Sequence, residues 1–220
     1  MTVVLAAIAA LALAVANWFI WVHAPLEETM GLVQKIFYIH LPMAWWGMIS
    51  FLAVFVGSVM VLWKKSAFWD RLAGASCEVG VLFSGLALVT GSLWGKPIWN
   101  VWWTWDPRLT TTLIMWFVYC AYLLLRQAGV GGERGAVVRA ALGVVAFLDV
   151  PLVFISARKW RSIHPTVFGQ QGGGLEPEMF TAVLVSIAAV GIFWVALVRL
   201  RTLQLGQDAA VRQAFLHRTR

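Results

Sequence analysis

Six long apolar runs dominate this sequence and limit what it can fold into. They span residues 2–22, 41–63, 73–93, 109–125, 137–157 and 180–200. Each run has about the 17–25 residues that a helix needs to cross the hydrocarbon layer of a bilayer. With 61% hydrophobic and 12% charged residues, the chain is too apolar for a soluble, disordered or fibrous protein. Because the runs are continuous and do not alternate with polar residues, a membrane β-barrel is also excluded.

The sequence therefore predicts an all-α polytopic membrane protein. We expect a bundle of six transmembrane helices that forms one domain over residues 1–220, since the longest connection between the runs is too short for a soluble domain. Within the first run, Ala14-Val15-Ala16 resembles a signal-peptide cleavage site. No Lys or Arg precedes that run, so a retained first span is the favoured interpretation.

The distribution of basic residues predicts the orientation of the chain. Eleven of the 17 Lys and Arg residues lie on the side that carries both termini, and six lie on the other side. Basic residues concentrate in cytoplasmic loops, so both termini should be cytoplasmic. The net charge of +7 is then explained by topology and anionic lipid, and no nucleic-acid partner is needed. Three connections face outward: 23–40, 94–108 and 158–179.

The second outward connection is exceptionally rich in tryptophan. Five of the 14 Trp residues lie within residues 94–106. An interfacial aromatic belt is the ordinary explanation, but a belt spreads its Trp over both membrane surfaces. The spacing of Trp99, Trp102, Trp103 and Asp106 predicts that they share one helical face. Such a face would form a flat apolar platform with indole N–H groups at its edge, which suits a large planar ligand. Platform and belt both remain open at this point.

Charged residues flank the tryptophans. Asp106 followed by Pro107 is typical of a helix start, with Asp as N-cap and Pro at the first helical position. Lys96 and Arg108 would meet the carboxylates of a ligand or anchor the loop at lipid headgroups.

Two of the four histidines face the same side as this loop. His40 lies at the outer start of the second span and His164 in the third outward connection, whereas His23 borders the first span and His217 lies in the basic tail. A single histidine is most often a structural residue. Two neutral imidazoles beside a tryptophan platform favour haem, because imidazole is a common axial ligand of haem iron.

Other polar residues within the spans carry less information. Cys77 and Cys120 lie inside apolar runs and form no CxxC, so neither a thiol-redox motif nor a zinc site is indicated. Glu78 and Asp149 are acids within spans, where charge usually faces a cavity or a partner. Pro151 should loosen the helix beside Asp149.

Three segments carry a resemblance to a known family. Residues 94–110, WGKPIWNVWWTWDPRLT, resemble the tryptophan-rich WWD signature of the cytochrome c assembly family of haem-handling proteins. Residues 38–45, YIHLPMAW, and 160–164, WRSIH, resemble that family's two histidine segments. The short chain with single outer histidines on either side of the signature is most similar to its CcmC branch, from about Val33 to Trp194. Asn100 departs from the small residue, often Gly, expected at that position.

The resemblance implies a haem-binding role. His40 and His164 would ligate a non-covalent b-type haem at the extracytoplasmic face. The haem and chaperone surface would comprise Trp94, Trp99, Trp102, Trp103, Trp105 and Asp106. It also implies three sets of partners: the haem chaperone CcmE, the ABC transporter formed by CcmA and CcmB, and the small protein CcmD. Arg108 as a partner of the haem propionates is a physical inference from its position.

The implied function is haem export and transfer and not catalysis, since the outward loops hold no nucleophile beside a positioned base. Three alternatives come from other classes. A haem-dependent membrane oxidoreductase would bury its histidines near the midplane. A complete haem lyase would carry more histidines, more spans and a large outer domain. A transporter with an aromatic gate would show inverted repeats and broken helices.

Overall fold

The structure is a computed structural model that describes residues 2–128, 132–160, 164 and 175–218. It is built from helices. The first, α1 (Thr2–Trp18), continues as a π-helical turn, η1 (Phe19–His23), and a 3₁₀ turn, η2 (Leu32–Ile36), precedes the second. The remaining helices are α2 (Phe37–Lys64), α3 (Ala67–Trp99), α4 (Pro107–Gln127), α5 (Gly132–Ala146), α6 (Asp149–Lys159) and α7 (Pro177–Arg218).

Within the described residues, six helical segments are long and apolar enough to cross a membrane. They cover residues 2–23, 32–64, 67–99, 107–127, 132–156 and 177–211, so the predicted six-span all-α fold is confirmed. The helices extend several residues beyond the apolar runs at most ends. His40 consequently lies in the first turn of α2, and Lys96 lies in the last turn of α3.

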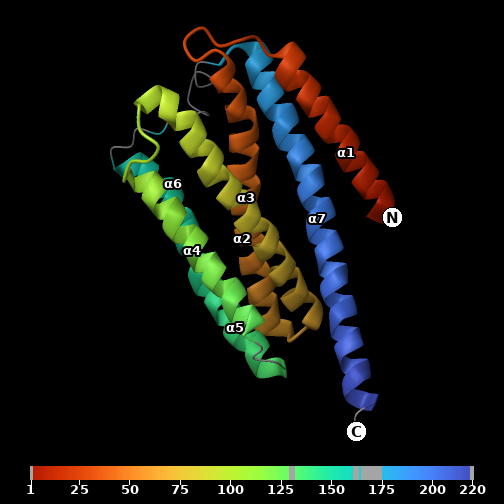
Figure 1. The fold of residues 1–220 in the computed structure, drawn as a ribbon. Helices are drawn as coiled ribbons and strands as arrows, with labels where there is room; N and C mark the ends of the chain where they lie inside the picture. Colours follow the sequence, from red (N-terminus) through yellow and green to blue (C-terminus); the bar gives the residue numbers. More distant parts are fainter. Residues whose placement is uncertain (1, 129–131, 161–163, 165–174, 219–220) are drawn as a thin grey trace.

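The helices form two packed groups that share α2 and α3. The α2–α3 hairpin is the centre of the bundle, with α7 and α1 packed on one side and α4, α5 and α6 on the other. The ends of η1, α3 and α6 lie at one end of the molecule (Figure 1). The helix ends from which the three predicted outward connections start are therefore on the same side of the bundle.

The fifth span is broken near its middle. Helix α5 ends at Ala146 and α6 begins at Asp149. Proline has no backbone N–H, so Pro151 cannot donate to the carbonyl of Phe147. That carbonyl accepts a bond from Val150 N instead, at 3.1 Å, which tightens the turn. The helix is therefore interrupted at residues 147–148, on the N-terminal side of Pro151.

Ion pairs tie the helices together at the opposite end. Asp70 on α3 accepts hydrogen bonds from Arg126 on α4, at 3.2 Å, and Arg139 on α5, at 3.1 Å. Glu78 on α3 pairs with Arg201 on α7. Glu78 therefore has a structural partner that accounts for an acid within a span.

Candidate functional site

A cavity of about 470 Å³ lies beneath the tryptophan loop, between α2, α3, α4 and α6. Most of its lining is aromatic or aliphatic. The predicted site residues that line it are His40, Trp94, Trp99, Trp102, Trp103, Arg108 and His164. This size and lining fit a flat, mostly apolar ligand held by a few polar groups. The site prediction rested on residues from three separate segments, and the fold brings most of them around one space.

His40 is held in a defined tautomer. Its Nδ1 lies 2.9 Å from the carbonyl oxygen of Ala87 on α3 and 3.2 Å from the hydroxyl of Thr90. A carbonyl only accepts, so Nδ1 carries the proton and donates to Ala87. In a neutral imidazole the other nitrogen, Nε2, then keeps a lone pair, which is the form that binds a metal.

Gly91 makes room for this imidazole. A Cβ at position 91 would lie 2.9 Å from Cε1 and 3.3 Å from Nδ1 of His40. Glycine therefore allows α3 to approach the His40 ring closely. Gly91 continues a stripe of small residues on α3, with Gly80, Ser84 and Ala87, that faces α2.

His164 lies opposite His40. The two ring centres are 6.4 Å apart, and the ring planes are inclined by 37°. A metal between two imidazoles has metal–nitrogen bonds of about 2 Å, which brings the ring centres to about 6 Å apart. The separation therefore matches one metal centre shared by both rings. Of the second histidine segment, the structure describes Trp160 and His164, and residues 161–163 lie outside the described residues.

Arg108 lies at the edge of the same space. Its Nη1 is 3.4 Å from His164 Nδ1, so a guanidinium stands beside the second imidazole. Arg108 also follows the helix start at Asp106, whose side chain accepts a hydrogen bond from Arg108 N at 2.9 Å. Asp106 is thus the N-cap of α4 with Pro107 at its first position, as the sequence indicated.

The tryptophan loop is not helical, so the prediction that Trp99, Trp102, Trp103 and Asp106 share a helical face is wrong. Helix α3 ends at Trp99, and Asn100 adopts a left-handed conformation with φ of 57°. Gly adopts this conformation most readily and Asn is among the few others that do. Asn100 therefore fills a position that requires positive φ, which explains why Gly would also serve there.

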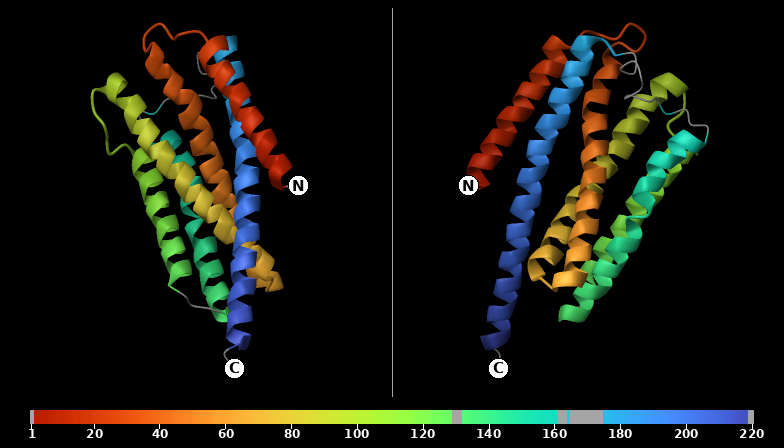
Figure 2. Two further views of the ribbon diagram at one scale, coloured as in Figure 1. Left: turned by 45° about the vertical axis from the view of Figure 1, so that its right-hand side comes forward. Right: turned by 180° about the vertical axis from the view of Figure 1, so that it is seen from behind.

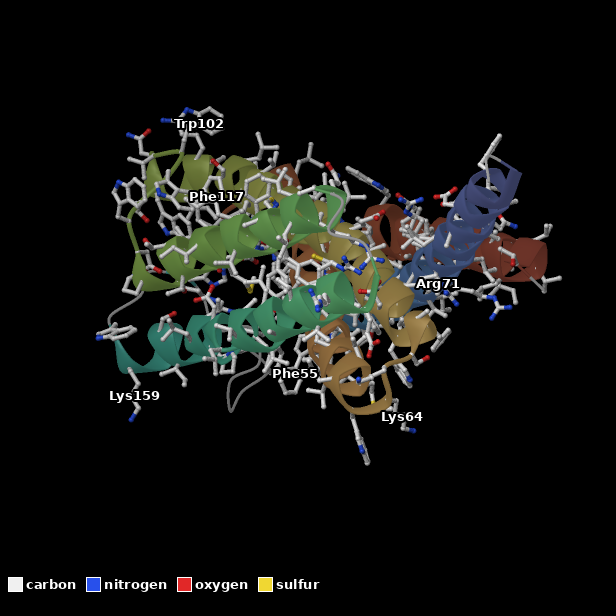
Figure 3. All side chains as sticks on the ribbon, turned by 90° about the horizontal axis from the view of Figure 1, so that it is seen from below. Phe55, Lys64, Arg71, Trp102, Phe117 and Lys159 are labelled. Carbon is white, nitrogen blue, oxygen red and sulfur yellow. The ribbon has the colours of Figure 1, made fainter. Side chains whose placement is uncertain are left out.

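The indoles occupy three different settings. Trp94 is buried, stacks over His40 at 6.5 Å and meets Trp99 edge-on at 6.1 Å. Trp102 is 58% exposed and projects from the periphery of the molecule (Figure 3). Trp103 lines the cavity and meets Trp105 edge-on at 6.0 Å. The tryptophans thus form a wall and a rim around the cavity and not one flat row.

Three of the highlighted residues do not line the cavity. Trp105 is 76% exposed, and Asp106 serves the start of α4. Lys96 donates to the carbonyl oxygen of Asn100 at 2.9 Å and lies 5.8 Å from the Trp102 ring. Lys96 therefore caps the end of α3, where a cation is favoured by the helix dipole.

The other histidines and acids lie elsewhere. His23 packs against Trp18 and Phe19 at the end of η1, and the side chain of His217 lies outside the described residues. Asp149 lies at the break between α5 and α6 and does not line the cavity.

Sequence reasoning missed several cavity residues because they look like ordinary membrane-helix residues. The main ones are Met48, Ala87, Gly91, Met115 and Phe154. One available signal was the stripe of small residues on α3 at helical spacing, which is typical of close helix contacts in membranes. A second signal was the position of Met48, eight residues after His40 and therefore on the same helix face.

Comparison with known proteins decides the family. A family profile described as "CcmC: Heme exporter protein C" matches residues 1–214. The chain belongs to the CcmC family. Among CcmC relatives, the heme exporter protein C of Bradyrhizobium diazoefficiens is 32% identical over 205 residues, covering 87% of this chain and 77% of its own. That of Haemophilus influenzae is 32% identical over 198 residues, covering 84% and 77%.

A third relative is mitochondrial. The putative cytochrome c biosynthesis ccmC-like mitochondrial protein of Marchantia polymorpha is 30% identical over 181 residues, covering 80% of this chain and 76% of its own. The resemblance inferred from the tryptophan and histidine segments therefore extends over most of the chain, as expected for membership of the CcmC family.

Proposed function

We propose that this protein holds haem at the extracytoplasmic face of the bacterial inner membrane and passes it to the haem chaperone CcmE for c-type cytochrome maturation. The haem is bound non-covalently as b-type haem, with His40 and His164 as axial ligands. The observation that carries the proposal is the 6.4 Å separation of the two imidazoles within an indole-lined cavity. The names of the bacterial and mitochondrial relatives support it independently, since they refer to haem export and cytochrome c biosynthesis.

The unsatisfied polar atoms of the cavity fit the proposed ligand. Trp103 Nε1 and Thr104 Oγ1 are buried with no hydrogen-bond partner among the described residues, and both residues line the cavity. Buried polar groups without partners are costly, so a ligand with acceptor oxygens would satisfy them. Haem has two carboxylates on one edge and an apolar remainder, which matches a rim with donors above an apolar floor.

The residues around the cavity then have distinct roles in holding and presenting haem. His40 donates through Nδ1 to Ala87 and offers Nε2 to the iron, and His164 occupies the opposite axial position. Trp94 and Trp99 cover part of the macrocycle and exclude water from it. The exposed side of the tryptophan loop contacts the chaperone, with Trp102 and Trp105 as its most exposed indoles. The protein works by binding and presentation, and the transfer chemistry belongs to the complex with the chaperone.

The wider assembly follows from the same family membership. We propose that the ABC transporter of CcmA and CcmB and the small protein CcmD work with this chain. Both termini lie in the cytoplasm, and the haem cavity lies on the extracytoplasmic side. The basic residues on the side of the termini support this orientation.

Replacing Arg108 with alanine should weaken haem binding through the loss of a carboxylate contact. A hydrogen bond to a charged group contributes about 1.5 kcal/mol or more, so the affinity should fall at least about tenfold. Titration of the purified variant with haem and with haem dimethyl ester, which has no carboxylate charge, measures the effect. The ester should bind wild type and variant equally.

The Lys96→Ala variant is the matched control, because Lys96 caps α3 and does not line the cavity. An equal loss of affinity for haem and its ester in the Arg108 variant would contradict the carboxylate contact. Arg108 would then act only by holding His164.

Replacing Trp102 and Trp105, the two most exposed indoles of the loop, together with alanine should weaken association with the chaperone while the fold persists. Central aromatic residues of an interface contribute at least about 2 kcal/mol, or about thirtyfold in affinity. Pull-down with the soluble domain of CcmE measures the loss, and helical content checks the fold. A Trp18→Ala/Trp21→Ala variant removes two other indoles, at the end of α1 and in η1, as a control. Unchanged association would mean that the loop is only a lipid belt.

A further inference from the structure

The cavity continues well below the two histidines. On α2 its lining includes His40, Ala44 and Met48, and on α4 it reaches Met115. At 1.5 Å per residue, Met48 lies about 12 Å along the helix from His40. This lower part is lined by apolar side chains within segments of membrane-spanning length. The ligands and Arg108 therefore occupy only the outer part of a deeper apolar space.

Two side chains of the lining are also exposed at the surface of the bundle. Trp45 on α2 is 39% exposed, and Phe154 on α6 is 40% exposed. Both lie inside segments that cross the membrane, at residues 32–64 and 132–156. The partial exposure of these two lining side chains therefore lies at the level of the hydrocarbon layer, on the side of the cavity between α2 and α6.

The two halves of the fifth span pack differently against the rest of the bundle. Helix α5 packs against α2 and α4, whereas the contacts of α6 in the described part of the chain are mostly with α4. The right-hand view of Figure 2 shows α2 and the α5–α6 segment close together at the α5 end and diverging toward the outer end. The α5–α6 segment is thus separated from α2 toward the outer end, where the cavity lies.

We propose that this side of the cavity is a lateral portal through which haem enters from the outer leaflet of the bilayer, between Trp45 on α2 and Phe154 on α6. The inference rests on the proposed function and adds the route of the ligand to it. Haem is apolar except for the carboxylate edge, so it dissolves in the membrane with that edge toward the headgroups. An entering macrocycle slides between α2 and α6 in the plane of the membrane and meets His40 and His164, while its carboxylates stay at the depth of Arg108.

The test measures how fast the full-length protein, reconstituted in phosphatidylethanolamine/phosphatidylglycerol vesicles, acquires the low-spin haem absorbance. Haem is supplied either already dissolved in the vesicle membrane or bound to albumin in the aqueous phase. Phe154→Ala widens the portal, and we expect the initial rate from the membrane to rise about tenfold. Phe154→Trp narrows it and should slow the same rate by a similar factor. Delivery should be faster from the membrane than from albumin in wild type.

Phe117→Ala is the matched control, because Phe117 is a lipid-exposed phenylalanine on α4 that does not line the cavity (Figure 3). Its rate should equal that of wild type. If both Phe154 variants acquire haem from the membrane at the wild-type rate, the proposed entry route is refuted, although the proposed haem binding stands. A wild-type chain that acquires no low-spin signal by either route would instead overturn the proposed function.

Discussion

Replacing His40 or His164 with alanine is expected to abolish the low-spin haem spectrum of the purified protein. The two rings are 6.4 Å apart, and each occupies one axial position, so one imidazole alone leaves the iron five-coordinate or bound to water. The affinity for haem should fall by more than about 100-fold, which exceeds the usual effect of losing a residue that only hydrogen-bonds to a ligand. Absorption spectroscopy of haem titrations measures both the spin state and the affinity.

His23→Ala is the control for this experiment. His23 is also at the outer end of the molecule, but it packs against Trp18 and Phe19 and does not line the cavity. It should bind haem as the wild type does. A low-spin spectrum that survives both the His40 and the His164 replacement would refute the assignment of these two ligands.

Replacing Gly91 with alanine is expected to weaken haem binding by about 10–100-fold, which is the usual effect of losing the hydrogen bond that orients a ligating histidine. The added Cβ would lie 2.9 Å from His40 Cε1, so the imidazole must move. The ring is the free end of a side chain and can rotate, so the helix pair persists while the bond from Nδ1 to Ala87 is lost. The iron then meets a misplaced ligand, and part of the haem should become high-spin.

The Gly206→Ala variant separates this effect from a general effect of alanine in a helix. A Cβ at Gly206 on α7 would be in ordinary contact with Arg71, at 3.5 Å. Alanine favours helix over glycine by about 0.5–1 kcal/mol, so neither variant should lower thermal stability through propensity. Normal low-spin haem in the Gly91 variant would show that His40 does not depend on its position against α3.

The loop between α3 and α4 shows where local reasoning succeeded and where it failed. The start of α4 at Asp106 and Pro107 was predicted because capping depends on neighbouring residues. The helical face of the tryptophans was predicted wrongly because a single residue, Asn100, adopts positive φ and ends α3. A tryptophan row has no strong conformational preference of its own, so its arrangement depends on this turn and on packing.

Pro151 and Glu78 illustrate the same difference. The sequence predicted a disturbed helix at Pro151, because the missing N–H is a property of proline itself. Glu78 could not be assigned from its neighbours, since its partner Arg201 is on α7, more than 100 residues later. Ion pairs of this kind depend on which helices pack together. Apolar runs of similar length do not specify which of the helices they form will be neighbours.

The sequence alone determined the six membrane-spanning helices, the gathering of the tryptophan loop and two histidines on one side, and the resemblance to haem-handling proteins. These features depend on the length of apolar runs, on the distribution of charge and on short motifs, all of which are local. Only the tertiary structure brought His40 within 6.4 Å of His164, set Gly91 against its ring and separated α6 from α2. Those relations arise from packing between segments distant in the chain, where contact is decided by the shapes of whole helices.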